Sequence, residues 1–77
     1  MLRVGIIGFG GAGQAHHFYF SCVAGCRVTK IFDPKPAAAT RAAGREAGDI
    51  FCADEERFWP DLDAVVICTP DGSHAHY

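Results

Sequence analysis

The chain has 77 residues, of which 49% are hydrophobic and 21% are charged, and its formal net charge at pH 7 is −2. A chain of this length buries only about 60% of its unfolded surface, which predicts one small domain of modest stability. The 7 basic residues are scattered, so neither nucleic acid nor a membrane surface is indicated as a partner. We find neither an apolar run of the ~18 residues that span a membrane nor a secretory leader, and therefore expect a cytoplasmic protein.

The first predicted element is a strand over Leu2–Ile7, which ends in a glycine-rich turn. Gly8, Gly10 and Gly13 have the spacing G-x-G-x-x-G. In this motif the first glycine permits a tight turn, the second lets a pyrophosphate approach the backbone, and the third lets the next helix pack against the strand. The positive end of that helix then faces the phosphates. The spacing predicts a dinucleotide site, although many dehydrogenases share it.

A helix is expected from Gly11 to about Val23. Residues that recur at helical spacing predict its buried face, namely Ala12, Ala15, His16, Tyr19, Cys22 and Val23. His17 is then expected to face solvent. The aromatic run 18–20 exceeds what one helix face can bury, so its outward members are candidates for contact with another domain or a partner.

The second predicted strand, Arg27–Phe32, ends at Asp33. Asp33 lies 20 residues after Gly13, which matches the ~20 expected of the acid that binds the adenosine ribose. Its carboxylate would repel a 2′-phosphate and so favours NAD, whereas the cation Lys35 keeps NADP open. The alternative for Asp33 is a turn residue before Pro34.

The remaining elements continue the alternation of strands and helices. The pattern predicts a helix over Pro36–Ala47, a short strand over Ile50–Cys52, a short helix capped by Asp54 with Phe58 and Trp59 as buried anchors, a strand over Ala64–Cys68, and a helix start at Ser73–Tyr77. This order predicts an α/β fold with a parallel Rossmann-type sheet. With predicted strands numbered along the chain, the expected order is 3-2-1-4, the first part of a doubly wound fold. We expect residues 1–77 to form a partial dinucleotide-binding domain of a longer protein, or to pair with another copy in a homo-oligomer.

The cysteines and C-terminal histidines carry no clear metal signature. Buried free thiols are the expected state of the four cysteines, and a redox or metal pair between Cys22 and Cys26 is the alternative. His74 and His76 stand two apart on a helix start and do not share a face. We therefore expect no metal site.

A second candidate site lies at residues 68–74, where the last predicted strand ends. Ligands of open α/β sheets bind at the carboxyl ends of strands, where the strand order reverses. Thr69 and Pro70 would then lie beside the cofactor, opposite the glycine turn. The alternative is a strand-ending turn that contacts no ligand.

Three segments together carry a more specific resemblance. V-G-I-I-G-F-G-G-A-G-Q-A-H, then I-F-D-P, then L-D-A-V-V-I-C-T-P-D-G-S-H resemble the amino-terminal domain of the Gfo/Idh/MocA oxidoreductases over essentially the whole chain. The resemblance implies that the pyrophosphate is bordered by Gly8, Phe9, Gly10, Ala12 and Gly13, the adenosine ribose by Asp33, and the cofactor crevice by Thr69, Pro70 and His74. We include Gly11, from the same turn, and the cation Lys35 in the candidate cofactor-binding set.

The family's activity is likewise an expectation here. Its members oxidise or reduce sugars, inositols and related polyols with NAD(P), and a second domain follows the Rossmann domain. The family's catalytic lysine lies in an E-K-P segment, and neither Lys30 nor Lys35 has that context, so we assign no catalytic residue. We expect the NAD(P)-binding part of a polyol oxidoreductase, inactive alone and acting on a small-molecule substrate only in the intact enzyme. A non-catalytic nucleotide-binding or sensing module and an S-adenosylmethionine-binding variant remain alternatives.

Overall fold

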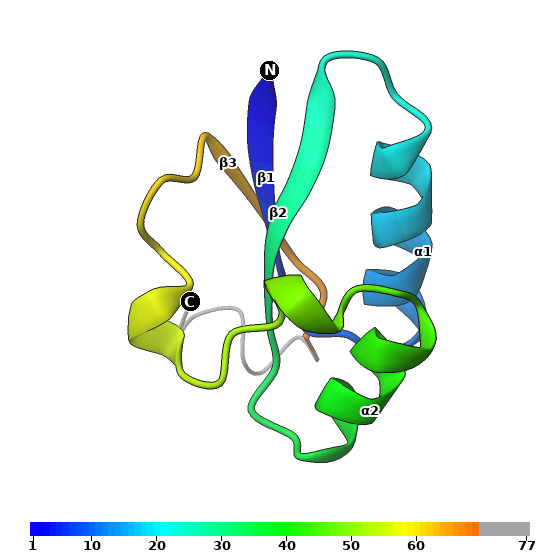
Figure 1. The fold of residues 1–77 in the computed structure, drawn as a ribbon, viewed down its shortest axis with the longest axis vertical. Coiled ribbons are helices and arrows are strands. Elements are labelled where there is room, and N and C mark those ends of the chain that lie inside the picture. Colours follow the sequence, from blue (N-terminus) through cyan, green and yellow to red (C-terminus); the bar gives the residue numbers. More distant parts are fainter. Residues whose placement is uncertain (70–77) are drawn as a thin grey trace.

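A three-stranded parallel sheet forms the centre of the computed structural model, which describes residues 1–69 (Figure 1). The elements in chain order are β1 (Leu2–Ile7), α1 (Gly11–Ser21), β2 (Cys26–Phe32), α2 (Ala37–Gly44), the 3₁₀ turns η1 (Gly48–Ile50) and η2 (Glu55–Arg57), and β3 (Ala64–Ile67). The strand order is β2-β1-β3, and both pairings are parallel. The expected α/β architecture with a Rossmann-like parallel sheet is therefore confirmed.

The predicted strand over Ile50–Cys52 is wrong as a strand. Ile50 ends η1, and Phe51 makes only an isolated parallel bridge with Ile31. The Cys52 N–H donates to the Ile31 carbonyl oxygen at 2.7 Å, so the segment does run beside β2. Because η1 ends at Ile50 and η2 is capped from Asp54, too few residues remain for a strand ladder. The four-stranded order 3-2-1-4 is thus not confirmed in residues 1–69.

The central strand β1 is buried on both faces, as expected for a parallel sheet with covering segments on each side. Ile6 belongs to a cluster beneath α1 and α2, and Ile7 belongs to a cluster with Phe32 and Phe58 on the opposite face. Successive side chains of a strand point to opposite faces, which explains this division. Figure 1 shows α1 and α2 together on one side of the sheet and the η2 segment on the other.

The predicted buried face of α1 is wrong at most of its positions. Ala12, Ala15, Tyr19, Cys22 and Val23 are exposed. The fully buried residue of α1 is Gly13, and the residues that follow it at helical spacing, His17 and Phe20, are partly buried. The close approach of Gly13 to β1 fixes the rotation of the helix, and the apolar pattern alone did not reveal it.

Two further expectations about α1 have different outcomes. His17 does not face solvent, because its ring contacts the buried Phe9 ring edge-on at a centroid distance of 5.8 Å. The aromatic run does leave members outside the core, since Phe18 is 58% exposed and Tyr19 is 63% exposed.

The segments after β2 match the predictions in part. Helix α2 ends at Gly44 rather than Ala47, and the Ala47 N–H closes the end by donating to the Ala42 carbonyl oxygen at 2.8 Å. Asp54 caps η2 as predicted, by accepting a hydrogen bond from the Arg57 N–H at 3.3 Å. Phe58 is fully buried, whereas Trp59, predicted to be buried, is 39% exposed.

The four cysteines are free thiols, as expected, but they are not buried. Cys22 is exposed, and the other three are partly exposed. Across residues 1–69, no group of three or more histidine, cysteine and carboxylate residues could hold a metal ion. None of the helices in this part of the chain is long and apolar enough to cross a membrane.

Candidate functional site

The glycine turn brings together the carboxyl ends of all three strands. Gly8 follows β1 with φ +92°, and its N–H donates to the Phe32 carbonyl oxygen at 2.7 Å. A Cβ at Gly8 would lie 2.9 Å from the Cys68 carbonyl carbon and 3.0 Å from the Thr69 nitrogen. Both the backbone conformation and the space therefore require glycine at this position.

The other two glycines of the motif have different surroundings. A Cβ at Gly13 would lie 1.9 Å from the Gly8 carbonyl oxygen, so the helix can pack this closely only on glycine. A Cβ at Gly10 would meet nothing within 4 Å. The turn and packing roles predicted for the first and third glycines agree with this geometry. The open space at Gly10 is where the prediction puts a pyrophosphate.

The N-terminus of α1 is open to an anion. Gly10 is the N-cap residue and supplies no side-chain hydrogen bond, and the first turn carries no acidic residue. The first intrahelical bond runs from the Gln14 N–H to the Gly10 carbonyl oxygen at 3.0 Å. The N–H groups of Gly11 and Ala12 precede it and lie at the positive end of the helix dipole.

Asp33, from the end of β2, lies directly against this turn. Its Oδ2 accepts a hydrogen bond from the Phe9 N–H at 2.8 Å, and its Oδ1 accepts one from the Lys35 N–H at 2.9 Å. The second bond is an Asx-turn contact, so Asp33 also has the turn role that the sequence left open. The structure thus brings the predicted ribose acid to the predicted phosphate turn. The Lys35 residue itself is exposed.

Arg41 of α2, the C-cap residue Arg45 that follows this helix, and Gln14 of α1 complete the site, and sequence reasoning missed all three. The Arg41 Nε donates to the Phe9 carbonyl oxygen at 2.7 Å, and its Nη2 lies 3.8 Å from the Asp33 Oδ2. Gln14 also donates to the Phe9 carbonyl, at 3.4 Å, and Arg45 donates to Gln14 at 3.1 Å. The available signal was the four-residue spacing of Arg41 and Arg45 at the end of the predicted helix 36–47.

The far wall of the site begins at the end of β3. The Cys68 N–H donates to the Ile7 carbonyl oxygen at 2.7 Å and extends the β1–β3 contact toward Thr69. The backbone of Thr69 therefore lies beside Gly8, and its place in a cofactor crevice stays a prediction. Pro70 and His74, the other two residues expected in this wall, lie outside the described residues, as does the predicted helix start after them.

Two titratable groups beside the turn are held in their neutral forms. Burial, with a smaller contribution from Arg45, lowers the pKa of His17 below its usual 6.5. Burial raises the pKa of the Cys68 thiol. For both groups, burial favours the neutral form.

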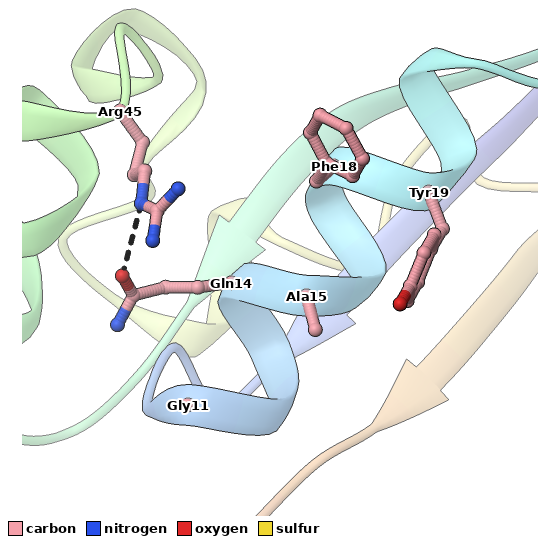
Figure 2. A pocket seen from close by; sticks show the side chains of 6 residues that line it. All are labelled: Gly11, Gln14, Ala15, Phe18, Tyr19 and Arg45. Atoms are coloured by element: carbon pink, nitrogen blue, oxygen red, sulfur yellow. Dashed lines mark hydrogen bonds between the residues drawn. The ribbon is translucent and has the colours of Figure 1, made fainter.

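A pocket of about 250 Å³ opens on the outer side of α1, next to the glycine turn. Its lining residues are Gly11, Gln14, Ala15, Phe18, Tyr19 and Arg45, and Figure 2 shows the Arg45–Gln14 hydrogen bond at its edge. Only Gly11 belongs both to this lining and to the predicted cofactor set. The pocket therefore neighbours the candidate site without coinciding with it.

Comparison with known proteins places this geometry in a family. Residues 2–77 match the family model GFO_IDH_MocA, described as an oxidoreductase family with an NAD-binding Rossmann fold. An inositol 2-dehydrogenase of Rhizobium meliloti is 38% identical over 74 residues, which are 96% of this chain and 22% of that protein.

Solved structures agree with the match. A putative myo-inositol dehydrogenase from Sinorhizobium meliloti has a TM-score of 0.80 at 36% identity, covering 99% of this chain and 23% of that chain. A UDP-N-acetylglucosamine 3-dehydrogenase from Acidithiobacillus ferrooxidans has a TM-score of 0.78 at 27% identity, over 95% and 23% of the two chains. The chain thus spans less than a quarter of these relatives. It belongs to the Gfo/Idh/MocA oxidoreductase family, within the NAD-binding Rossmann domain of that family.

Proposed function

We propose that residues 8–13 bind the pyrophosphate of NAD, that Asp33 binds its adenosine ribose, and that Thr69 borders the crevice between them. The observation that carries this proposal is the 2.8 Å hydrogen bond from the Phe9 N–H to Asp33. It fixes the acid at the end of β2 beside the glycine turn, where one ligand can reach both. The open face of Gly10 and the uncapped start of α1 supply the space and the N–H donors.

The cofactor set also includes groups that the structure supports less directly. Lys35 is kept as a cation near the ribose because it follows the Asp33 turn. Pro70 and His74 remain in the set through the family resemblance alone. None of these residues is assigned a part in hydride transfer, because the cofactor carries that chemistry and the protein binds and orients it.

The binding proposal is tested by titrating the chain with NADH and following the nicotinamide fluorescence. We expect saturable binding, because the fold positions the turn, the acid and the helix N-terminus without further residues. The Gly10→Ala variant should fold normally, since its Cβ meets nothing within 4 Å, but its methyl group occupies the proposed pyrophosphate space.

The matched control is Gly44→Ala, at the end of α2, where a Cβ also meets nothing within 4 Å. Circular dichroism checks that all three proteins are folded. If the folded wild-type chain does not bind NADH, or if Gly10→Ala binds as well as Gly44→Ala, the proposed site is wrong.

For the whole protein, we propose an oxidoreductase that moves a hydride between a CH–OH group of a sugar, inositol or related polyol and NAD. The similarity to inositol dehydrogenases and to a UDP-sugar dehydrogenase supports this substrate class. Within the described residues the four residues of β3 are partly exposed and β3 pairs only with β1, so the sheet has an unpaired edge there.

The activity proposal is tested on the chain and on its gene. Residues 1–77 mixed with NAD and myo-inositol should produce no NADH, since no catalytic residue is assigned to them. An open reading frame that continues beyond Tyr77 with an E-K-P segment within about 20 residues, a span typical of βαβ units, would support the enzyme. Turnover by the 77-residue chain alone would overturn this division of roles.

A further inference from the structure

The peptide groups of Phe9 are held from two sides by groups of opposite charge. Asp33 accepts a hydrogen bond from the Phe9 N–H at 2.8 Å, and Arg41 donates one to the Phe9 carbonyl oxygen at 2.7 Å. Phe9 lies between the first two glycines of the turn. The acid and the base therefore fix the conformation of the segment that faces the proposed pyrophosphate.

The same arginine also reaches the acid itself. Its Nη2 lies 3.8 Å from the Asp33 Oδ2, and the side chains are 33% exposed for Arg41 and 9% exposed for Asp33. A cation this close, in a largely covered site, offsets much of the field that the carboxylate projects toward an approaching anion. The usual reason for an aspartate at this position to reject a 2′-phosphate is therefore weakened.

Arg41 also keeps donor capacity for a phosphate. A guanidinium carries five N–H donors, of which the Nε–H is used by the Phe9 carbonyl and one Nη2–H faces Asp33. A third of the side chain is exposed, so the side chain is accessible to a ligand. A planar guanidinium with free N–H groups is well suited to phosphate oxygens.

Lys35 is the less suitable cation for this role. It contacts Asp33 through its backbone N–H, at 2.9 Å, and the residue is exposed. Arg45, the C-cap residue after α2, donates to Gln14 instead. Of the three cations, Arg41 is the one whose side chain both holds the turn and meets the acid.

We propose that Arg41 sets the tolerance of this site for a 2′-phosphate, so that the chain binds NADPH as well as NADH. This inference rests on the proposed function, because it takes the adenosine ribose to lie at Asp33. It adds a positioning and specificity-determining residue on α2, next to the acid that the proposal assigns to the adenosine ribose.

The test is the ratio of NADPH to NADH affinity, measured by fluorescence titration of the wild-type chain and of Arg41→Met. Wild type should bind both dinucleotides. Arg41→Met should bind NADH more weakly, because the Phe9 carbonyl loses a donor, and NADPH more weakly still. The loss of a charge-assisted hydrogen bond predicts a fall in the ratio of about tenfold or more.

Two further variants separate charge from structure. Arg45→Met removes the same charge from the C-cap of α2 without touching Asp33, and it should change both affinities in proportion. Arg41→Lys keeps the charge but cannot make the same planar contacts, so its ratio should lie between wild type and Arg41→Met. Because Arg41→Lys retains a cation at the turn, this variant can still test the inference if Arg41→Met fails to fold.

The outcomes are distinguishable from failure of the proposed function. If the wild-type chain binds neither NADH nor NADPH, both the NAD site and this inference are overturned. NADH binding with a ratio that Arg41→Met and Arg41→Lys leave unchanged would overturn the role of Arg41 alone. The role of Arg41 would also be overturned if the ratio of NADPH to NADH affinity fell as far in Arg45→Met as in Arg41→Met, or fell further still in Lys35→Met.

Discussion

The contact between Gly13 and the turn makes a sharp prediction about stability. In Gly13→Ala, the new Cβ would lie 1.9 Å from the Gly8 carbonyl oxygen and 2.9 Å from its carbonyl carbon. Non-bonded heavy atoms prefer separations of about 3.5 Å, so the start of α1 must move away from β1 by about 1.5 Å. This movement also loosens the packing of His17 and Phe20 over the core.

The cost follows from this displacement. Overpacking a well-packed site typically costs about 1–3 kcal/mol, and alanine returns at most about 1 kcal/mol of helix preference. We expect Gly13→Ala to lower the free energy of unfolding by about 2 kcal/mol. For a domain of this size, this shifts the thermal midpoint down by about 8–16 °C. Thermal unfolding followed by circular dichroism measures the shift.

A second glycine provides the control. Gly44→Ala places its Cβ in open space within α2, so the same chemical change should raise stability slightly, by up to about 1 kcal/mol. If Gly13→Ala unfolds at the same temperature as wild type, the close packing of α1 on the turn is not needed for the fold, and the argument for the third glycine fails.

Three more predictions concern the core and the pH dependence of stability. Phe58→Ala should cost about 3–5 kcal/mol and unfold much of the population in urea titrations, whereas Trp59→Ala, at an exposed position, should keep a cooperative transition. Burial lowers the pKa of His17, so the unfolded chain binds the proton more tightly and stability should fall as the pH drops below about 6.5. In His17→Gln, the urea midpoint should therefore depend less on pH between about pH 7 and pH 5. A pH dependence equal to that of wild type would refute this prediction. Hydrogen bonds from Arg3 lower the pKa of Asp63, so this pair should stabilise the fold above pH 3.8 and less as the pH falls through the lowered value. In Asp63→Asn, this loss of stability on acidification should be absent. An acid-unfolding curve identical to that of wild type would exclude a contribution of the pair.

Local sequence patterns identified most of the strands and helices, because the formation of such elements depends mainly on residues that are close in the sequence. The apolar run before Gly8 and the run at Ala64–Ile67 are strands as predicted, and the alternation with helices correctly indicated a parallel sheet. Asp54 was recognisable as a cap because a cap bonds to an N–H only three residues away. The strand predicted over residues 50–52 was wrong because the apolar residues there suit a strand, whereas the 3₁₀ turns on both sides leave too few residues for a ladder of strand hydrogen bonds.

The sequence alone was enough to locate the glycine turn and to predict Asp33 as the acid beside it, since glycine spacing and the distance to Asp33 are local and topological constraints. The buried face of α1 could be read only from the folded chain, because the rotation of this helix depends on the contact of Gly13 with the backbone of Gly8. The tertiary structure also decided that Arg41 meets both Phe9 and Asp33. Contacts between α2 and a turn more than 30 residues earlier arise from packing on a shared sheet, and no local pattern encodes them.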